Sequence, residues 1–188
     1  KTITVTASYT DGYNTAESMT SNATTAVANV DDTATGTLGV TGTAQEGGTL
    51  NATLTSVVDA DGATTTAWQW QISNDGSTGW TNLAGATSAS YAIASDQSQV
   101  GKYLRVVATT TDALGGTTTF SGNASAQIAN INDLPTASVT IAGTATQGQV
   151  LTAANTLADA DGLGTIAYQW KANGSAITGA TASTYTLT

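Results

Sequence analysis

The fold is decided by residues Lys102–Asp133, KYLRVVATTTDALGGTTTFSGNASAQIANIND, because a similar stretch occupies Lys1–Asp32, KTITVTASYTDGYNTAESMTSNATTAVANVDD. The two stretches align without a gap, and the matched pairs include Lys1 with Lys102, Asp11 with Asp112, and Asn29 with Asn130. Self-similarity at a fixed spacing is the sequence signature of a repeat architecture. The alignment therefore predicts a structural repeat of about 100 residues.

A second pair of similar stretches follows, at Gly42–Tyr91 and Gly143–Tyr185. DADG occurs at 59–62 and again at 159–162, and WQW at 68–70 matches YQW at 168–170. We therefore expect the chain to be a piece of a longer polypeptide. The predicted parts are the C-terminal hairpin of one repeat at 1–32, a complete repeat at 33–132, and the N-terminal strands of a third repeat at 133–188.

The residue patterns inside each repeat are those of short β-strands. Leu104, Val106 and Ala108 alternate with the residues between them, and this period of two indicates a half-buried strand. In the complete repeat, the residue patterns predict strands at 36–43, 49–55, 65–73, 80–84, 88–94, 102–110 and 117–128. Trp70 lies in the third of these. About seven strands per 100 residues is typical of an immunoglobulin-like sandwich. We predict an all-β fold of tandem immunoglobulin-like Greek-key β-sandwiches joined by short linkers.

The composition excludes several kinds of function. The 188 residues carry a formal net charge of −9, with 4 Lys and Arg against 13 Asp and Glu, and they include no Cys and no His. Disulfides, thiolate nucleophiles, imidazole ligands and a Ser-His-Asp triad are therefore absent. Four cations are too few to neutralise a nucleic-acid backbone, and no stretch is apolar for long enough to insert into a membrane. We do not expect an enzyme, because no nucleophile or base accompanies the Asp59 and Asp61 pair.

The Asp residues fall in predicted turns and linkers. One interpretation is plain turn chemistry, because Asp bonds its own backbone in turns. The other is a metal site, because carboxylates gathered at one end of a sandwich repel each other unless a cation such as Ca²⁺ intervenes. At the first junction the candidate calcium ligands are Asp31, Asp32, Asp59, Asp61 and Asp112. At the second junction they are Asn130, Asn132, Asp133, Asp159 and Asp161, with Glu46 contributed by the preceding repeat.

The stretches GKYLRVVATTTDALGG, ANINDLP, GTATQG and LADADGLGT resemble the tandem immunoglobulin-like or cadherin-like repeats of very large bacterial surface adhesins, many of the repeats-in-toxin type. The segment Asn130–Pro135 is similar to the inter-domain linker of cadherins, and Asn29–Asp32 is a shorter copy without the Pro. The resemblance implies an extracellular location on a bacterial cell surface. It also implies that the Asn and Asp of the linker ligate Ca²⁺ and stiffen the junction.

Two functions follow as expectations. The first is a structural or adhesive module that builds an extended stalk or filament, with neighbouring repeats as partners. In that arrangement, residues 1–32 of one copy complete residues 133–188 of the next, head to tail. The alternative is a carbohydrate-binding sandwich, with host or surface glycans as partners and with Trp68 and Trp80 as the stacking residues.

Overall fold

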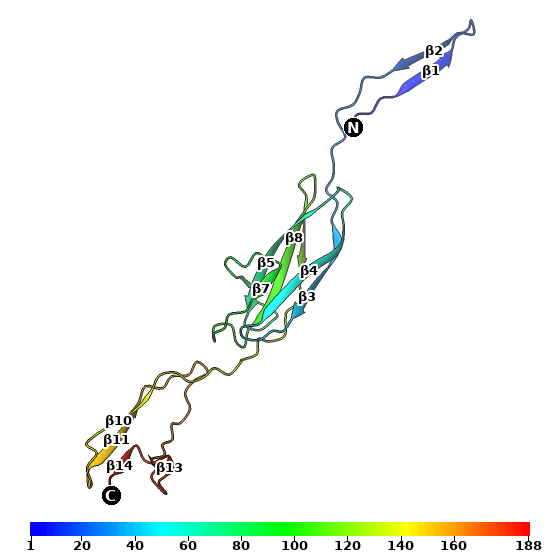
Figure 1. Ribbon diagram of the computed structural model, residues 1–188. Helices are drawn as coiled ribbons and strands as arrows, with labels where there is room; N and C mark the ends of the chain where they lie inside the picture. The colour runs from blue at the N-terminus through cyan, green and yellow to red at the C-terminus, as the bar shows by residue number, and fades with distance from the viewer.

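The structure is a computed structural model that describes residues 1–188, and its secondary structure consists of strands without any helix. Five small sheets contain the fourteen strands. Figure 1 shows three bodies in a row, with a hairpin at one end, a larger two-sheet body in the middle and a smaller body at the other end. No helix is therefore present that is long and apolar enough to cross a membrane.

The N-terminal body is a hairpin of β1 (Thr6–Thr10) and β2 (Ala16–Thr20), which pair only with each other. Its turn is organised by Asp11, whose Oδ1 accepts hydrogen bonds from the N–H groups of Tyr13 and Thr15, both at 2.8 Å. An Asp that bonds its own backbone in this way is a standard turn former. The hairpin therefore forms from local contacts, without a second sheet behind it.

The central body has two sheets that together make an arrangement of the β-sandwich type. The first sheet has the order β3-β4-β7 and the second β6-β5-β8-β9. The strands are β3 (Thr35–Gly42), β4 (Thr49–Val58), β5 (Thr65–Ser73), β6 (Thr81–Asn82), β7 (Ser90–Ala92), β8 (Tyr103–Thr111) and β9 (Thr117–Ser121). All seven predicted strand positions are occupied.

The predicted last strand is longer than the observed β9, which ends at Ser121. Beyond it the chain still runs beside β8, and the N–H groups of Gly122, Ser125 and Ile128 donate to carbonyls at 2.8, 2.7 and 2.8 Å. In a regular β-ladder, alternate residues of a strand bond to the neighbouring strand. Here the bonds come at every third residue, so they do not form a ladder. The segment is therefore attached to β8 without being a regular strand.

The core of the central body joins its two sheets. Leu50 of β4 packs in one cluster with Trp70 of β5 and with Leu104 and Val106 of β8, and each is at most 2% exposed. Along β8 the side chains alternate between half-buried and buried, as the sequence pattern predicts. Fully burying a large apolar side chain contributes roughly 1.5–3 kcal/mol. The cluster therefore holds the sheets together without disulfides.

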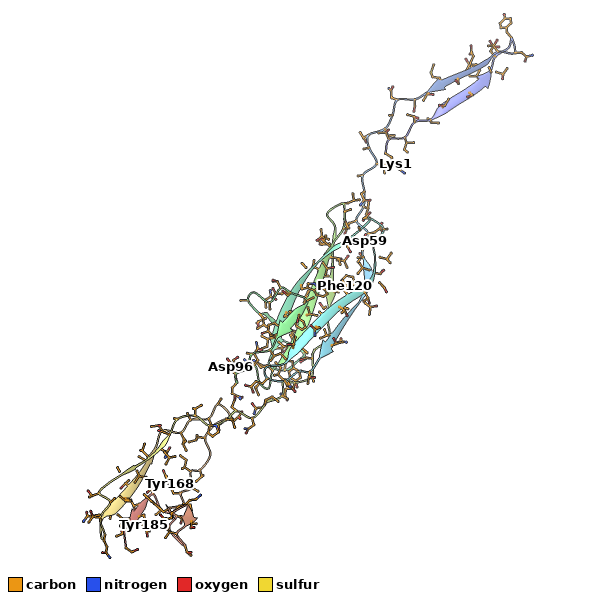
Figure 2. All side chains as sticks on the ribbon, viewed as in Figure 1. Lys1, Asp59, Asp96, Phe120, Tyr168 and Tyr185 are labelled. Carbon is orange, nitrogen blue, oxygen red and sulfur yellow. The ribbon has the colours of Figure 1, made fainter.

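The C-terminal body repeats the first sheet of the central body. Its strands β10 (Val139–Ala142), β11 (Val150–Asn155) and β14 (Thr184–Thr186) have the order β10-β11-β14. The second sheet is reduced to the short hairpin of β12 (Lys171–Ala172) and β13 (Ser175–Ala176). Ile141 of β10 is 64% exposed. Figure 2 labels Tyr168 and Tyr185 on this body, which lacks any strand equivalent to β8 or β9.

Candidate metal sites at the two junctions

The first junction lies at the end of the central body that faces the N-terminal hairpin, where Figure 2 labels Asp59. Three segments meet there: the linker before β3, the loop between β4 and β5, and the turn between β8 and β9. Antiparallel strands in a sandwich return their loops to the same end, so the topology brings these segments together. The acidic residues that each segment carries therefore become neighbours in space.

Three carboxylates form the centre of this junction. Asp31 of the linker, Asp61 of the β4–β5 loop and Asp112 of the β8–β9 turn each offer an oxygen, and these oxygens all lie within 4.8 Å of one another. Two ligands on opposite sides of one Ca²⁺ ion are about 4.6–5.2 Å apart, from bond lengths of about 2.3–2.6 Å. The cluster could therefore hold a metal ion, with water and backbone oxygens completing the coordination.

Hydrogen bonds hold two of the three carboxylates in place. The Oδ1 atom of Asp112 accepts from the N–H groups of Leu114 and Gly116, at 2.6 and 3.2 Å, and the side chain is only 8% exposed. Asp61 Oδ2 accepts from the N–H group of Asp32 at 2.7 Å, which attaches the linker to the β4–β5 loop. Asp112 is fixed by its own turn, and Asp61 by the linker that it binds.

The third carboxylate, Asp31, is electrostatically unfavourable as it stands. Its pKa is raised because the surrounding protein displaces water, and then because of the charge and hydrogen bond of Asp112 and the charges of Asp61 and Asp59. Like charges disfavour the ionised form of a neighbouring acid, and a cation has the opposite effect. A bound divalent ion would therefore relieve the repulsion within the cluster.

Gly116 leaves the space in which this cluster forms. A β-carbon at this position would overlap the carboxylate of Asp31 and also approach that of Asp112. The backbone of Gly116 already donates to Asp112, so the residue both shapes the turn and leaves room for the linker acid. Any larger residue at 116 would push Asp31 away from Asp112.

The second junction places amide groups where the first has carboxylates alone. Gln97 Nε2 donates to the Oδ1 atoms of Asn130 and Asp161, at 2.7 and 2.8 Å, and Asn130 Nδ2 donates to the same Asp161 oxygen at 2.7 Å. Asp161 Oδ2 accepts from the N–H group of Asp133 at 2.7 Å. The backbone of Asp133, then the amides of Asn130 and Gln97, lower the pKa of Asp161. Hydrogen-bond donors of the protein thus stabilise the negative charge of Asp161, which an ion would otherwise neutralise.

Glu46 extends the second junction into the preceding domain. Its side chain is 7% exposed, and Oε2 accepts from the N–H group of Ile131 at 3.2 Å. Gln97 also approaches Glu46 and the Asp133 carboxylate, at 3.5 and 3.4 Å. One side chain of the central body therefore contacts acidic groups on both sides of the linker.

The remaining predicted ligands have local roles. Asp59 Oδ1 accepts from the N–H group of Asp61, and Asp159 Oδ1 accepts from that of Asp161, each at 2.9 Å. Asn132 Nδ2 donates to the carbonyl of Asp133 at 2.9 Å. Turn chemistry and ligand geometry thus coexist, because in each Asp-Ala-Asp-Gly loop the first Asp positions the second.

Gln97 is the participant that the sequence reasoning missed. It lies in the segment 95–101, which connects β7 to β8 at the end of the domain opposite Asp59, close to the labelled Asp96 in Figure 2. The position of this loop at the second junction was the signal that could have identified it. Asp96 itself accepts from the N–H group of Ser98 at 2.9 Å, as turn chemistry predicts.

The two Trp residues considered for sugar stacking are engaged with other side chains. Trp68 packs against the central core, and the guanidinium of Arg105 lies 4.4 Å from the ring centroid of Trp80. Trp80 Nε1 also donates to the Ser77 carbonyl at 3.3 Å. These positions provide no observation in favour of the carbohydrate hypothesis.

No protein-family model, curated protein or solved structure matches this chain. The fold and the first junction nevertheless define a class. The chain is an all-β protein of several small sheets, with an arrangement of the β-sandwich type and three acidic residues, Asp31, Asp61 and Asp112, that could bind a metal ion.

Proposed function

We propose that this chain is an extracellular structural or adhesive module of a bacterial surface protein. Its tandem immunoglobulin-like Greek-key repeats form an extended stalk or filament, and Ca²⁺ stiffens the connections between repeats. The observation that carries this proposal is the cluster of Asp31, Asp61 and Asp112 at the first junction. An ion there would bind the linker and two loops of one domain simultaneously.

The sheet topology supports the repeat architecture. The orders β3-β4-β7 and β6-β5-β8-β9 are those expected for an immunoglobulin-like sandwich with a short extra strand at one edge. Trp70 lies between the sheets with no exposed surface, and Gln45 forms a parallel bridge to Ala129 that joins the first and last segments. The resemblance to adhesin repeats rests on the same residues as these strands and linkers.

The shape supports an extended role. The three bodies follow one another in a line, and the chain enters the central body at one end and leaves it at the opposite end (Figure 1). In such an array each unit contacts only its neighbours, so the flexibility of the whole depends on the linkers. An ion that joins a linker to the following domain removes freedom at the point where bending would otherwise occur.

Calcium titration by isothermal calorimetry tests this proposal. We expect one principal site in the full chain and its loss in Asp31→Asn, which removes a carboxylate from the cluster. Asp96→Asn removes the same charge at the opposite end of the domain and should retain the site. Gly116→Ala keeps all three carboxylates but should weaken binding about tenfold or more, because its methyl group would displace Asp31.

Small-angle X-ray scattering tests the stiffening itself. With calcium we expect a narrower distribution of shapes and a longer maximum dimension than with chelator. Asp31→Asn should give the same scattering under both conditions. Binding without any change in scattering would contradict the stiffening role, and the absence of binding in the unmodified chain would contradict the calcium site.

A further inference from the structure

We propose that Asn173 is a modification site, at which the folded chain deamidates spontaneously through a cyclic imide formed with the backbone nitrogen of Gly174. The product carries an aspartyl or an isoaspartyl residue at position 173, and the isoaspartyl form loosens the hairpin around it. The inference is independent of the proposed calcium sites and of the proposed stalk. It follows from a comparison of the turns in which Asn or Asp precedes Gly.

Asn173 and Gly174 form the tip of the hairpin between β12 and β13, and Figure 1 labels β13 beside this turn. Ala172 pairs with Ser175 across it, so the turn has two residues. The φ angles are 49° for Asn173 and 83° for Gly174. A two-residue hairpin turn of type I′ needs positive φ at both central positions, and this need favours the pair Asn-Gly. The geometry of the turn therefore accounts for the presence of this sequence.

The two groups that would react make no other contacts of their own. Asn173 and Gly174 are both exposed. Among residues 1–188, no hydrogen bond engages the side-chain amide of Asn173 or the N–H group of Gly174. Gly174 has no side chain, and nothing lies within 4 Å of the position that a β-carbon would occupy there. The nitrogen of Gly174 is therefore unhindered when the turn flexes toward Cγ of Asn173.

The covalent step needs only water. The nitrogen of Gly174 loses its proton and bonds to Cγ of Asn173, and the Nδ2 group takes up a proton and leaves as ammonia. One water molecule then opens the cyclic imide at either of its two carbonyl groups. One opening restores the normal backbone with an aspartyl side chain, and the other routes the backbone through the former side chain. In both products a carboxylic acid replaces the amide, and the mass increases by about 1 Da.

The chain has four further turns in which an acidic residue precedes Gly, at Asp11, Asp61, Asp75 and Asp161. Each of these carboxylates accepts a hydrogen bond from a backbone N–H group. Such bonds favour the ionised form, which is a poor target for a nucleophile. At Asp75 the side chain and backbone of Thr78, then the backbone of Ser77, lower the pKa of the carboxyl. Asn173 differs because its amide is neutral and unbound.

Asn123 provides an internal reference for the effect of the following residue. It is exposed, and its side chain makes no hydrogen bond among residues 1–188, as at Asn173. The next residue is Ala124, whose β-carbon hinders the approach of the backbone nitrogen. We therefore expect Asn173 to deamidate at least tenfold faster than Asn123, a difference of about 1.4 kcal/mol in barrier height.

Peptide mass spectrometry of the full chain, incubated folded in a mildly alkaline buffer, measures both rates. Trypsin cleaves after Lys171, and residues 172–188 contain Asn173 as their only Asn and include no Gln. We expect this peptide to gain about 1 Da in two forms that chromatography separates. A sample digested before incubation sets the baseline. No gain in this peptide, or equal rates at Asn173 and Asn123, would overturn the inference.

Two variants test the role of the following Gly in opposite directions. Gly174→Ala should slow deamidation at Asn173 at least tenfold, and Ala124→Gly should accelerate it at Asn123 at least tenfold. The second variant keeps the test valid if Ala at 174 distorts the hairpin, because it leaves that turn unchanged. An unchanged rate at Asn123 in Ala124→Gly would overturn the inference.

Hydrogen exchange measures the effect of the modification on the hairpin. The Ile177 N–H group donates to the Trp170 carbonyl at 2.9 Å, close to the turn. An isoaspartyl residue adds an atom to the backbone of a turn shaped for two residues, whereas Asp-Gly also fits a type I′ turn. We expect the Ile177 N–H group to exchange faster in the isoaspartyl fraction than in Asn173→Asp. Equal exchange in the two would overturn the loosening of the hairpin.

Discussion

The two junctions occupy equivalent positions in the repeat, and within residues 1–188 their acidic groups have different neighbours. At the first, Asp31, Asp61 and Asp112 converge with backbone donors but no side-chain amide between them, and the pKa of Asp31 is raised. At the second, Gln97 and Asn130 donate to Asp161, and the pKa of that residue is lowered. The linker acid of the first junction, Asp31, corresponds to Asn132 in the second.

This difference shows that a metal site cannot be ranked by linker similarity alone. The second linker, Asn130–Pro135, is the closer match to a cadherin linker, but the carboxylate cluster forms at the first. At the second junction, Gln97 of the preceding domain donates to Asp161 and Asn130, and within residues 1–188 no side-chain amide donates to the three carboxylates of the first junction. The donors around Asp161 therefore stabilise its charge without an ion.

The largest expected effect is calcium stabilisation of the first junction, measured by thermal melting of the full chain. A ligand that binds only the folded state at 100 times its Kd stabilises by about 2.7 kcal/mol, or about 10 °C or more for a domain of this size. Asp31→Asn, which gives the first linker the residue found in the second, should lose most of this shift. Asn132→Asp should add little, because the amides around Asp161 remain.

A comparable calcium shift in Asp31→Asn and in the unmodified chain would break the contrast between the junctions. It would show that calcium acts at a site other than the cluster of Asp31, Asp61 and Asp112. The midpoint should also rise with calcium concentration as mass action requires.

A smaller effect is expected when the second junction is made to resemble the first. Gln97→Glu replaces the donor to Asn130 and Asp161 with another carboxylate, which should cost about 1–3 kcal/mol in chelator. Calcium should restore part of the loss. Hydrogen exchange at the Asp133 N–H group, which donates to Asp161, reports this junction directly.

Gln149→Glu is the matched control, because it adds the same charge at an exposed position on the C-terminal body. We expect its Asp133 N–H group to exchange as slowly as in the unmodified chain. Unchanged protection in Gln97→Glu would mean that the amide of Gln97 does not hold the second junction together.

The smallest expected effect is a pH dependence that differs between the junctions. The raised pKa of Asp31 means that the folded chain binds its proton more tightly than the unfolded chain does. Stability should therefore fall as pH rises from the ordinary value of 3.8 through the raised value. Asp161, with a lowered pKa, should instead lose its contribution as pH falls below 3.8 and through the lowered value.

Melting curves in chelator between about pH 3 and pH 6 separate these two contributions. The difference in stability between Asp31→Asn and the unmodified chain should grow with pH in favour of the variant. A constant difference across this range would contradict the repulsion among Asp31, Asp61 and Asp112.

Much of the fold follows from the sequence because the repeat supplies two versions of most segments. The alternation of apolar and polar residues in Leu104–Ala108 locates β8. The turn residues on either side of it set where the neighbouring strands begin and end. The gathering of Asp31, Asp61 and Asp112 also follows, because strand order determines which loops share an end. These are consequences of periodicity and topology, which a single sequence can reveal.

The donors at the second junction do not follow in the same way. Gln97 is one polar residue in an irregular loop, and its contacts with Asn130 and Asp161 depend on how the C-terminal body sits against the central one. The reduction of the fourth predicted strand to Thr81–Asn82 is similar, because only Gln71 and Ile72 of β5 pair with it in register. Which groups a side chain contacts, and where two strands stop pairing, depend on three-dimensional packing that local sequence patterns do not encode.

The independence of the N-terminal hairpin has a consequence for how a longer array would be made. A hairpin that folds from local contacts forms early, before the sheet that covers it is chosen. In an array of similar repeats, several neighbours would offer nearly the same apolar face, so closure on the wrong repeat becomes a competing outcome. In the proposed array, differences such as Ile3 for Leu104 and Val27 for Ile128 would favour pairing of each hairpin with its own repeat during synthesis. In the proposed array, such sequence variation among repeats would protect against domain swapping.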